Sequence, residues 1–341
     1  MTAAKAAQKR YFDARRAEAV SLRTVASLRL TLVLFGLLGA ALVAVNLTQW
    51  PATWLIAVPC ALLAVNLLAA IAAHPAFRLR MPLLVFHLAL AAVLLLAAMG
   101  RMTHLKGELE LSTGDTFEGV LTRTQAAPWH RSKLGEVRFT NAGYAIDYAP
   151  GVKRGRTANR IVWRDESGFE RESVVGDDVP FTLFGYRFYT SFNKGFAPIV
   201  RWQPANGSPV QRGTIHLPSY PLHEHGQAQE WTPPGADAKL WLMLKFDEML
   251  LDPERHSQFR LPQRHTLIVR EGARRVELAP GGGMDLAQGT LVYEGLTTWM
   301  GYTVFSDWTL PWLVVASLVA TAGLAWHFAS RFAARSWMSP C

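Results

Sequence analysis

Cysteine is scarce in this chain of 341 residues, which has only Cys60 and Cys341. Neither lies in the one long hydrophilic stretch, residues 101–307, so no disulfide can stabilise it. At roughly 200 residues, that stretch is long enough to fold on an apolar core alone. The sequence contains no Cys-x-x-Cys and no Cys-x-x-Cys-His motif, which excludes a thiol oxidoreductase and a c-type cytochrome.

Motifs of the common enzyme classes are also missing. The sequence contains no Gly-x-Ser-x-Gly, His-Glu-x-x-His or phosphate-loop pattern. Its carboxylates are scattered, and no pair of them marks a site for acid–base catalysis. We therefore predict no catalytic residue in this chain, which would act at most as a non-catalytic subunit of a larger enzyme.

Charge is absent from three long apolar runs, at residues 30–77, 81–100 and 308–330. A bilayer core is crossed by about 20 apolar residues in a helix, because unsatisfied backbone groups cannot face lipid. The first run is too long for one helix, and a polar cluster at 46–51 divides it. The sequence thus predicts four membrane spans, near residues 30–48, 53–73, 82–100 and 308–330. They separate a basic tail (1–29), a hydrophilic domain (101–307) and a short tail (331–341).

The positive charge predicts how these spans are oriented. Residues 1–29, Arg78, Arg80, Arg331 and Arg335 together carry the whole formal charge of +9, whereas residues 101–307 are electrically balanced. Flanks rich in Lys and Arg stay on the cytoplasmic side of a membrane. We expect a multi-pass protein of the inner (cytoplasmic) membrane, with both termini cytoplasmic and residues 101–307 periplasmic or otherwise extracytoplasmic. The basic pI of about 9.8 is then a topology signal and does not indicate nucleic-acid binding.

Short alternating runs rich in β-branched and aromatic residues fill the hydrophilic stretch, and Gly, Pro, Asn and Asp separate them. They occur at residues 108–111, 137–139, 144–148, 161–163, 181–184, 186–189, 199–202, 240–244, 266–269 and 290–293. This pattern is typical of an antiparallel sandwich or barrel. The predicted fold class is four transmembrane helices plus one extracytoplasmic β-rich domain. Residues 245–260 are compatible with either a helix or a strand.

His87 is the leading candidate for a functional residue in the membrane. It lies six residues inside the third span, and an ionisable group there needs a partner. One interpretation is a neutral imidazole that is hydrogen-bonded to another helix. The other is an axial ligand of haem, for which neutral imidazole is a common donor.

His327, in the fourth span, is the second candidate. The predicted topology places it in the same leaflet as His87, so the two imidazoles could hold haem between them. His327 is also one turn before Arg331, where histidine is common at a membrane interface. His74 and His104 border spans and are interpreted as interfacial residues.

A further pair of histidines occurs in His223–Glu224–His225. On a strand, two imidazoles two residues apart share a face and could bind zinc or copper. This segment is polar and flanked by proline, and no third ligand is apparent. A surface loop is therefore the favoured interpretation, and no metal site is predicted.

The layout resembles ResB (also called CcsB), the cytochrome c biogenesis family of the system II pathway. Three stretches carry the resemblance. The first is residues 81–108, with His87 in the third span and the sequence from Gly100 to Glu108 after it. The second is Val179–Pro180–Phe181 followed by residues 184–192, and the third is Asp307–Trp308 at the entry to the last span, which ends in Trp337 after a basic cluster. Together they extend over most of the chain.

The resemblance implies a function in haem delivery. Members of the family act with a second membrane protein, CcsA, to move haem outward and attach it to apocytochrome c. His87 matches the family's histidine that binds a transient membrane-embedded haem of the b type, and the partner supplies the opposing ligand. The alternatives are a membrane-anchored periplasmic scaffold or assembly factor without its own cofactor, and a metal-handling protein that uses His223 and His225.

Overall fold

The computed structural model describes residues 22–48 and 53–336. Most of the basic tail, residues 49–52 of the polar break and Trp337 lie outside this range. The described chain divides into two compact units. The helical unit contains the chain up to Leu105, residues 126–131 and the chain from Asp307 onward, and the sheet unit contains residues 106–125 and 132–306.

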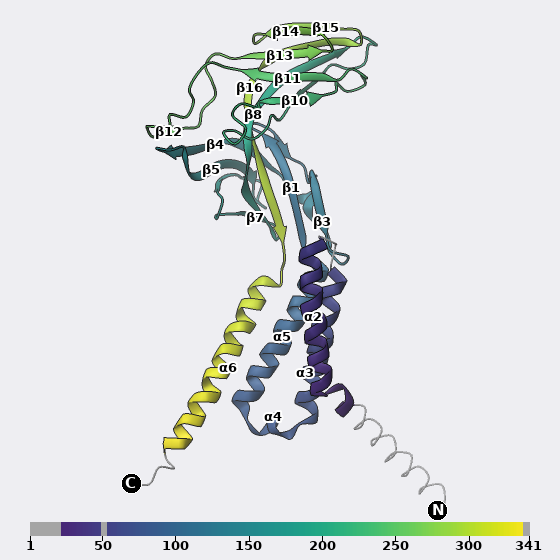
Figure 1. Cartoon of the computed structure of the whole chain (residues 1–341), viewed down its shortest axis with the longest axis vertical. Coiled ribbons are helices and arrows are strands. Elements are labelled where there is room, and N and C mark those ends of the chain that lie inside the picture. Colours follow the sequence, from purple (N-terminus) through teal and green to yellow (C-terminus); the bar gives the residue numbers. More distant parts are fainter. Residues whose placement is uncertain (1–21, 49–52, 337–341) are drawn as a thin grey trace, which may run out of the picture. The chain divides into compact units, whose positions relative to one another are not determined.

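Four long apolar helices make up most of the helical unit (Figure 1). They are α2 (Leu28–Thr48), α3 (Thr53–Ala73), α5 (Met81–Thr103) and α6 (Leu310–Ser336), and the short α4 (Pro75–Leu79) connects α3 to α5. A helix of 21 residues such as α2 measures roughly 30 Å, which matches the hydrocarbon core of a bilayer. All four long helices have the length and composition to cross a membrane. The predicted helices of the fold class are confirmed.

The helices pack in a row, with α3 between α2 and α5, and α5 between α3 and α6. Gly323 of α6 approaches the backbone of Phe86 in α5, so an added Cβ atom would lie 3.0 Å from the Phe86 nitrogen. Near the other end of α5, Gly100 is in close contact with Thr309 at the start of α6 and with Asp307. These two contacts make α5 and α6 antiparallel neighbours.

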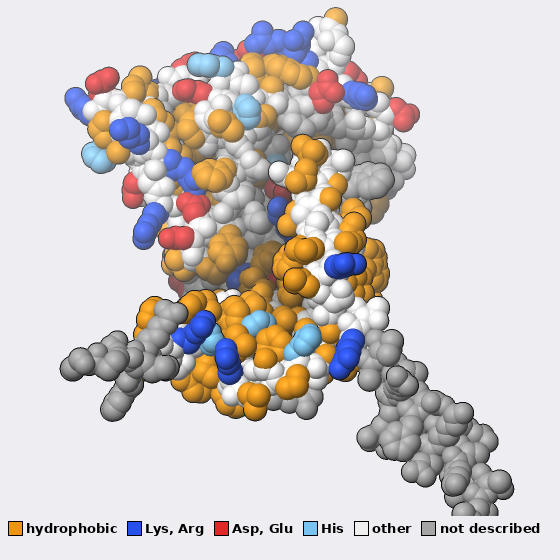
Figure 2. All heavy atoms as spheres, turned by 60° about the horizontal axis from the view of Figure 1, so that its bottom comes forward, with side chains coloured by type: hydrophobic (Ala, Val, Ile, Leu, Met, Phe, Trp, Pro, Cys, Tyr) orange, Lys and Arg blue, Asp and Glu red, His pale blue; other side chains and the backbone are white. Residues whose placement is uncertain are grey.

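A buried amide joins α3 to the start of α2. Asn66 is 3% exposed. It accepts a hydrogen bond of 2.7 Å from Thr31 and donates to the carbonyl groups of Val25 and Ser27. The start of α2, helix α4 and the end of α6 therefore lie at one end of the helical unit (Figure 1). Basic and histidine side chains are visible among hydrophobic ones at this end (Figure 2).

The sheet unit contains three antiparallel sheets. The seven-stranded sheet has the order β3-β1-β16-β8-β7, with β15 paired to β16 and β9 paired to β8. A four-stranded sheet has the order β10-β11-β13-β14, and a five-stranded sheet has β12-β4-β5-β6, with β2 paired to β4. This architecture confirms the predicted β-rich part of the fold class.

The strands have the following bounds: β1 Leu105–Ser112, β2 Thr116–Phe117, β3 Arg123–Ala126, β4 Phe139–Ala149, β5 Lys153–Arg164, β6 Glu170–Val175, β7 Phe181–Leu183, β8 Tyr186–Pro204, β9 Gln211–Thr214, β10 Ala228–Trp231, β11 Leu240–Lys245, β12 Ser257–Gln258, β13 Thr266–Glu271, β14 Arg274–Leu278, β15 Gly283–Leu286 and β16 Gly289–Ser306. After β11, the residues to 260 form turns and the short β12, without a helix. Strand β1 begins two residues after α5 ends, and β16 ends four residues before α6 begins.

Aromatic side chains form much of the core of the sheet unit. Phe139 of β4 is 2% exposed, and its ring centroid lies 5.1 Å from that of Phe188 and 5.8 Å from that of Tyr302. The Tyr302 hydroxyl donates to Asn159 over 2.7 Å, so its polar atom is satisfied inside the core. Burial of such rings contributes about 2 kcal/mol each, which suits a unit that has no disulfide.

Candidate functional site

His87 lies in the second turn of α5, and its side chain is half-buried. The ring atom Nδ1 lies 2.7 Å from the carbonyl oxygen of Leu83, one turn earlier in the same helix. A carbonyl oxygen only accepts hydrogen bonds, so this contact assigns the proton to Nδ1. The Nε2 atom of the neutral ring then carries a free lone pair, and it has no partner among the described residues.

Two aromatic rings lie next to the imidazole. The Phe77 ring of α4 lies edge-on to it, with ring centroids 4.7 Å apart, and the Phe86 ring does the same at 5.0 Å. These contacts fix the orientation of the ring and surround it with apolar groups. The arrangement around His87 is one in which an imidazole can act as a ligand through Nε2, with its tautomer set by the opposite nitrogen.

His327 lies on α6 and is also half-buried. Its ring centroid is 5.7 Å from that of Phe328, and its ring nitrogens have no hydrogen-bond partner in the described part of the chain. Because α5 and α6 are antiparallel and Gly323 faces Phe86, His327 is at the same end of the helix pair as His87. The two imidazoles thus lie in the same half of the helix pair, about one to two turns apart along the helix axes.

The two histidines nevertheless lie on different sides of α5. The groove between α5 and α6 is lined on α5 by a single face that includes Val85, Ala89 and Ala92. At 100° per residue, His87 is roughly 145° from the middle of that face. It shares a stripe with the buried Ala91 and with Ala98, which packs on Ile56 and Cys60 of α3. The described contacts do not bring His87 and His327 together.

The other two histidines near the helix ends have different surroundings. His74 is exposed and precedes α4 without capping it. His104 ends α5, and its Nδ1 lies 3.1 Å from the Arg101 carbonyl oxygen and 3.2 Å from that of Gly100. Such contacts satisfy the last turn of a helix.

The segment His223–Glu224–His225 forms exposed turns shortly after the cis bond between Tyr220 and Pro221. It is not a strand, so the two imidazoles do not share a sheet face. No group of three potential metal-ligating side chains occurs within residues 22–48 and 53–336.

One polar network was not predicted from the sequence. His216 Nδ1 lies 2.9 Å from Glu110 Oε2, and its Nε2 lies 3.0 Å from Ser112 Oγ. The atoms have the order of a Glu–His–Ser relay, but Ser112 is 0% exposed and also bonds to Thr214. A substrate cannot reach that hydroxyl group. The network therefore joins β1 to the segment after β9. The sequence carries no signal for it, because no motif links residues so far apart in the chain.

Together, the four candidate spans, the antiparallel sheets and His87 define a membrane protein with a large β-rich domain and an imidazole available for ligation in its helical unit. No protein-family model matches the chain, and no curated protein matches it. A solved structure named "Cytochrome c Heme Lyase CcmF" is similar over 88% of this chain, with 15% identity and a TM-score of 0.28. This chain spans 34% of that protein's length. At such a TM-score, the similarity supports no conclusion on fold or function.

Proposed function

We propose that this protein is a haem-handling subunit of cytochrome c biogenesis of the system II type. With a CcsA-like membrane partner, it would move haem outward and present it to apocytochrome c. The observation that carries the proposal is the state of His87. The Leu83 carbonyl group holds the proton on Nδ1, and the Nε2 lone pair has no partner among the described residues.

The residues around His87 fit a flat, apolar cargo such as haem. Phe77 and Phe86 supply apolar ring edges next to the imidazole. The donor is a single neutral nitrogen, as expected of an axial haem ligand. In this proposal haem is the cargo that is passed on. The protein's own contribution is to hold the imidazole in one tautomer and one orientation.

A partner is needed because His87 and His327 lie on different sides of α5. A second axial ligand for cargo at His87 would then come from another membrane protein, as the resemblance to ResB implies. Among the described helices, one side of α2 and one side of α6 have no neighbouring helix, so such a partner has room to pack. His327 remains a second candidate ligand, on the α6 side of the row.

The alternative function is a membrane-anchored scaffold without a cofactor of its own. The hydrogen bond between His87 and Leu83 favours this alternative, because the Leu83 carbonyl already satisfies one ring nitrogen of His87 without any metal. The third interpretation, metal handling by His223 and His225, has less support, since these side chains are exposed in turns.

The visible absorption spectrum separates these functions. The protein would be purified in a mild detergent, alone and after co-expression with a CcsA-like partner. A Soret band in the complex that is lost in a His87→Ala variant would support haem handling. A clean protein spectrum in both preparations, with cytochrome maturation unchanged in the variant, would favour the scaffold.

A further inference from the structure

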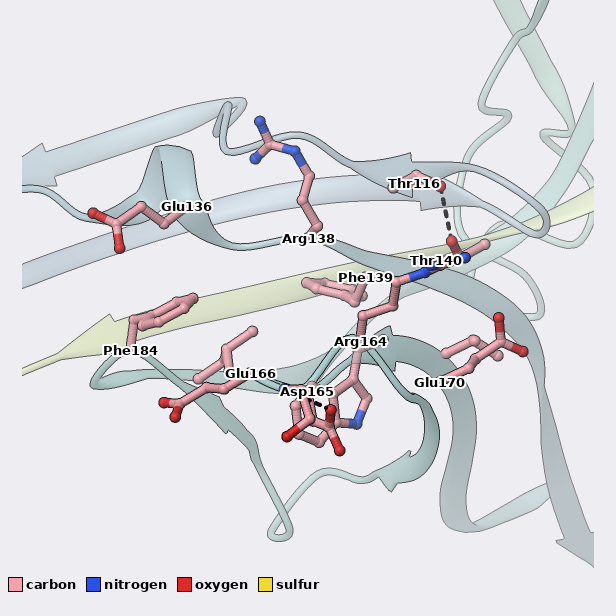
Figure 3. Close-up of a pocket in the computed structure, with 14 residues that line it drawn as sticks. Thr116, Glu136, Arg138, Phe139, Thr140, Arg164, Asp165, Glu166, Glu170 and Phe184 are labelled. Carbon is pink, nitrogen blue, oxygen red and sulfur yellow. Dashed lines mark hydrogen bonds between the residues drawn. The ribbon is translucent and has the colours of Figure 1, made fainter.

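A hollow in the sheet unit has the features of a binding site and has no part in the proposed role of His87. Its volume is about 740 Å³. Phe139, Val162, Trp163 and Leu183 form apolar parts of its wall, and Phe184 adds an aromatic ring at the β7–β8 turn. Phe139 lies near the centre of the view and Phe184 toward one side of it (Figure 3). Phe139 is 2% exposed, so Val162, Trp163, Leu183 and Phe184 are the apolar residues open to a ligand. This wall offers a place for an apolar side chain.

Phe184 is held in an unfavourable backbone conformation. Its φ angle is +50°, and that of Gly185 is +81°, so both central residues of this two-residue turn are left-handed. Such turns favour Asn-Gly, because a side chain with a bulky Cβ substituent is strained there. Phe184 is nevertheless 43% exposed, so burial does not explain why an aromatic residue occupies this position.

The charged side chains around the hollow are mainly acidic. The carboxylates of Glu136, Glu166 and Glu170 have no ion-pair or hydrogen-bond partner among the described residues, although all three residues line the hollow. Asp165 is already engaged by Arg171 and by the backbone of Ser167 and Phe169.

Two arginines also line the hollow. The guanidinium group of Arg138 donates to the carbonyl groups of Gly135 and Val137, whereas that of Arg164 has no partner within the described chain. Bonds to neutral carbonyl groups leave the charge of Arg138 in place. With Asp165 paired to Arg171, the lining holds three carboxylates against two guanidinium groups, a surplus of one negative charge. This balance favours a cationic ligand.

The carboxylates are spread around the hollow. Glu136 and Glu170 lie at opposite sides of it, and Glu166 lies near Phe184 (Figure 3). One small cation cannot contact all three, but an extended chain can place several basic side chains along them. The long stems of Lys and Arg also pack well on apolar surface while their charged ends stay in water.

We propose that this hollow docks a basic polypeptide segment of a partner protein. An apolar or aromatic side chain of the segment packs against Trp163 and Phe184, and Lys or Arg side chains on either side pair with Glu136, Glu166 and Glu170. The inference stands whether or not His87 binds haem, because it uses only residues of the sheet unit.

The test is a binding titration on the full-length protein in detergent. The probes are two fluorescent peptides of equal length, one of alternating Lys with a central Phe and one in which Glu replaces every Lys. Fluorescence anisotropy should show saturable binding of the Lys peptide, weakened by added salt, and none of the Glu peptide. Equal binding of both peptides, or of neither, would overturn the proposal.

Two variants locate the binding. Combined Glu136→Gln, Glu166→Gln and Glu170→Gln substitutions keep the side-chain shapes and should weaken the Lys peptide about tenfold, as expected for three exposed ion pairs. The matched control, Glu224→Gln with Glu230→Gln and Glu254→Gln, removes three other exposed carboxylates and should change binding less than twofold. If both triple variants bind alike, the site is not this hollow.

Phe184→Asn gives an independent readout. Asn suits the left-handed turn, so the melting temperature should stay the same or rise, while affinity for the Lys peptide falls several-fold because the aromatic wall is lost. Unchanged affinity in this variant would contradict the assignment of Phe184. Haemin serves as a second probe. If haemin binds in a way that depends on Arg164 and the Lys peptide does not bind, a basic segment is excluded as the ligand.

Discussion

The Nδ1 atom of His87 lies 2.7 Å from the carbonyl oxygen of Leu83, and this one contact decides which ring nitrogen is available. A histidine that used Nδ1 for a ligand would have to break this bond inside the membrane. A histidine that uses Nε2 keeps it. The contact therefore makes the role of His87 testable by substitution, because the bond joins the side chain only to its own helix.

We expect His87→Ala to remove haem from the protein purified with its partner, while membrane insertion and the sheet unit stay intact. The replacement deletes the iron ligand but adds no charge to the membrane, so the loss of stability should be limited to a cavity effect of about 2 kcal/mol. The Soret absorbance per protein measures the result. Added imidazole should restore part of it by filling the vacated position.

His327→Ala is the comparison for that experiment. Because His327 and His87 lie on different sides of α5, haem content should be retained in this variant if the second ligand comes from a partner. An equal loss in both variants would instead indicate a bis-histidine site within this chain. Full haem content and normal cytochrome maturation in His87→Ala would make that histidine structural.

Reporter fusions should reveal the topology. Arg23, Arg29, Arg80 and Arg331 gather at the end of the helical unit that contains α4. Basic flanks stay in the cytoplasm. A reporter that works only outside the cytoplasm should be active when fused after residue 200 and inactive at residues 10 and 341. Cytoplasmic activity at residue 200 would overturn the predicted orientation.

A fragment of about residues 103–305 should fold without the membrane spans. It contains all three sheets and no cysteine, so its circular dichroism should be dominated by strand signal and should not change with a reducing agent. Residues 126–131 belong to the helical unit, and we expect only that short segment to lose its contacts. A helix-dominated spectrum would contradict this expectation.

Lys194 should limit the stability of the sheet unit below about pH 8. Its side chain is 2% exposed, and Nζ has no hydrogen-bond partner among the described residues. Burial and, to a lesser extent, the charge of Arg154 lower the pKa of Lys194 to about 8, while Asp177 acts in the opposite direction. The unfolded chain therefore binds this proton more tightly, so stability rises as the pH increases from about 8 to 10.5.

Lys194→Met keeps much of the side-chain volume and removes the buried charge. We expect the free energy of unfolding at pH 7 to rise by up to about 3 kcal/mol, and its increase between pH 8 and 10 to become smaller. Denaturant titrations at the two pH values measure both effects. Lys239→Met, at an exposed position, serves as the control and should change neither. A lower stability of Lys194→Met at pH 7 would mean that the ammonium group is satisfied in solution.

Local sequence was sufficient for the elements of this fold. The uncharged runs predict helices because the backbone in lipid must satisfy its own hydrogen bonds. The alternation at residues 144–148 and 240–244 predicts strands because one sheet face is buried, and β4 and β11 cover these residues. His87 was identifiable as a candidate because an ionisable group is rare at that position in a span.

Long-range packing decided the rest. His87 and His327 are both in spans, but only the rotation of α5 against α3 and α6 determines that they lie on different sides of α5. The relay from Glu110 through His216 to Ser112 joins residues more than 100 positions apart, and the hollow around Phe139 gathers side chains from β2, β4, β5 and the β7–β8 turn. Sequence periodicity predicts which face of an element is buried. It does not specify which other element covers that face, because many pairings bury the same apolar area.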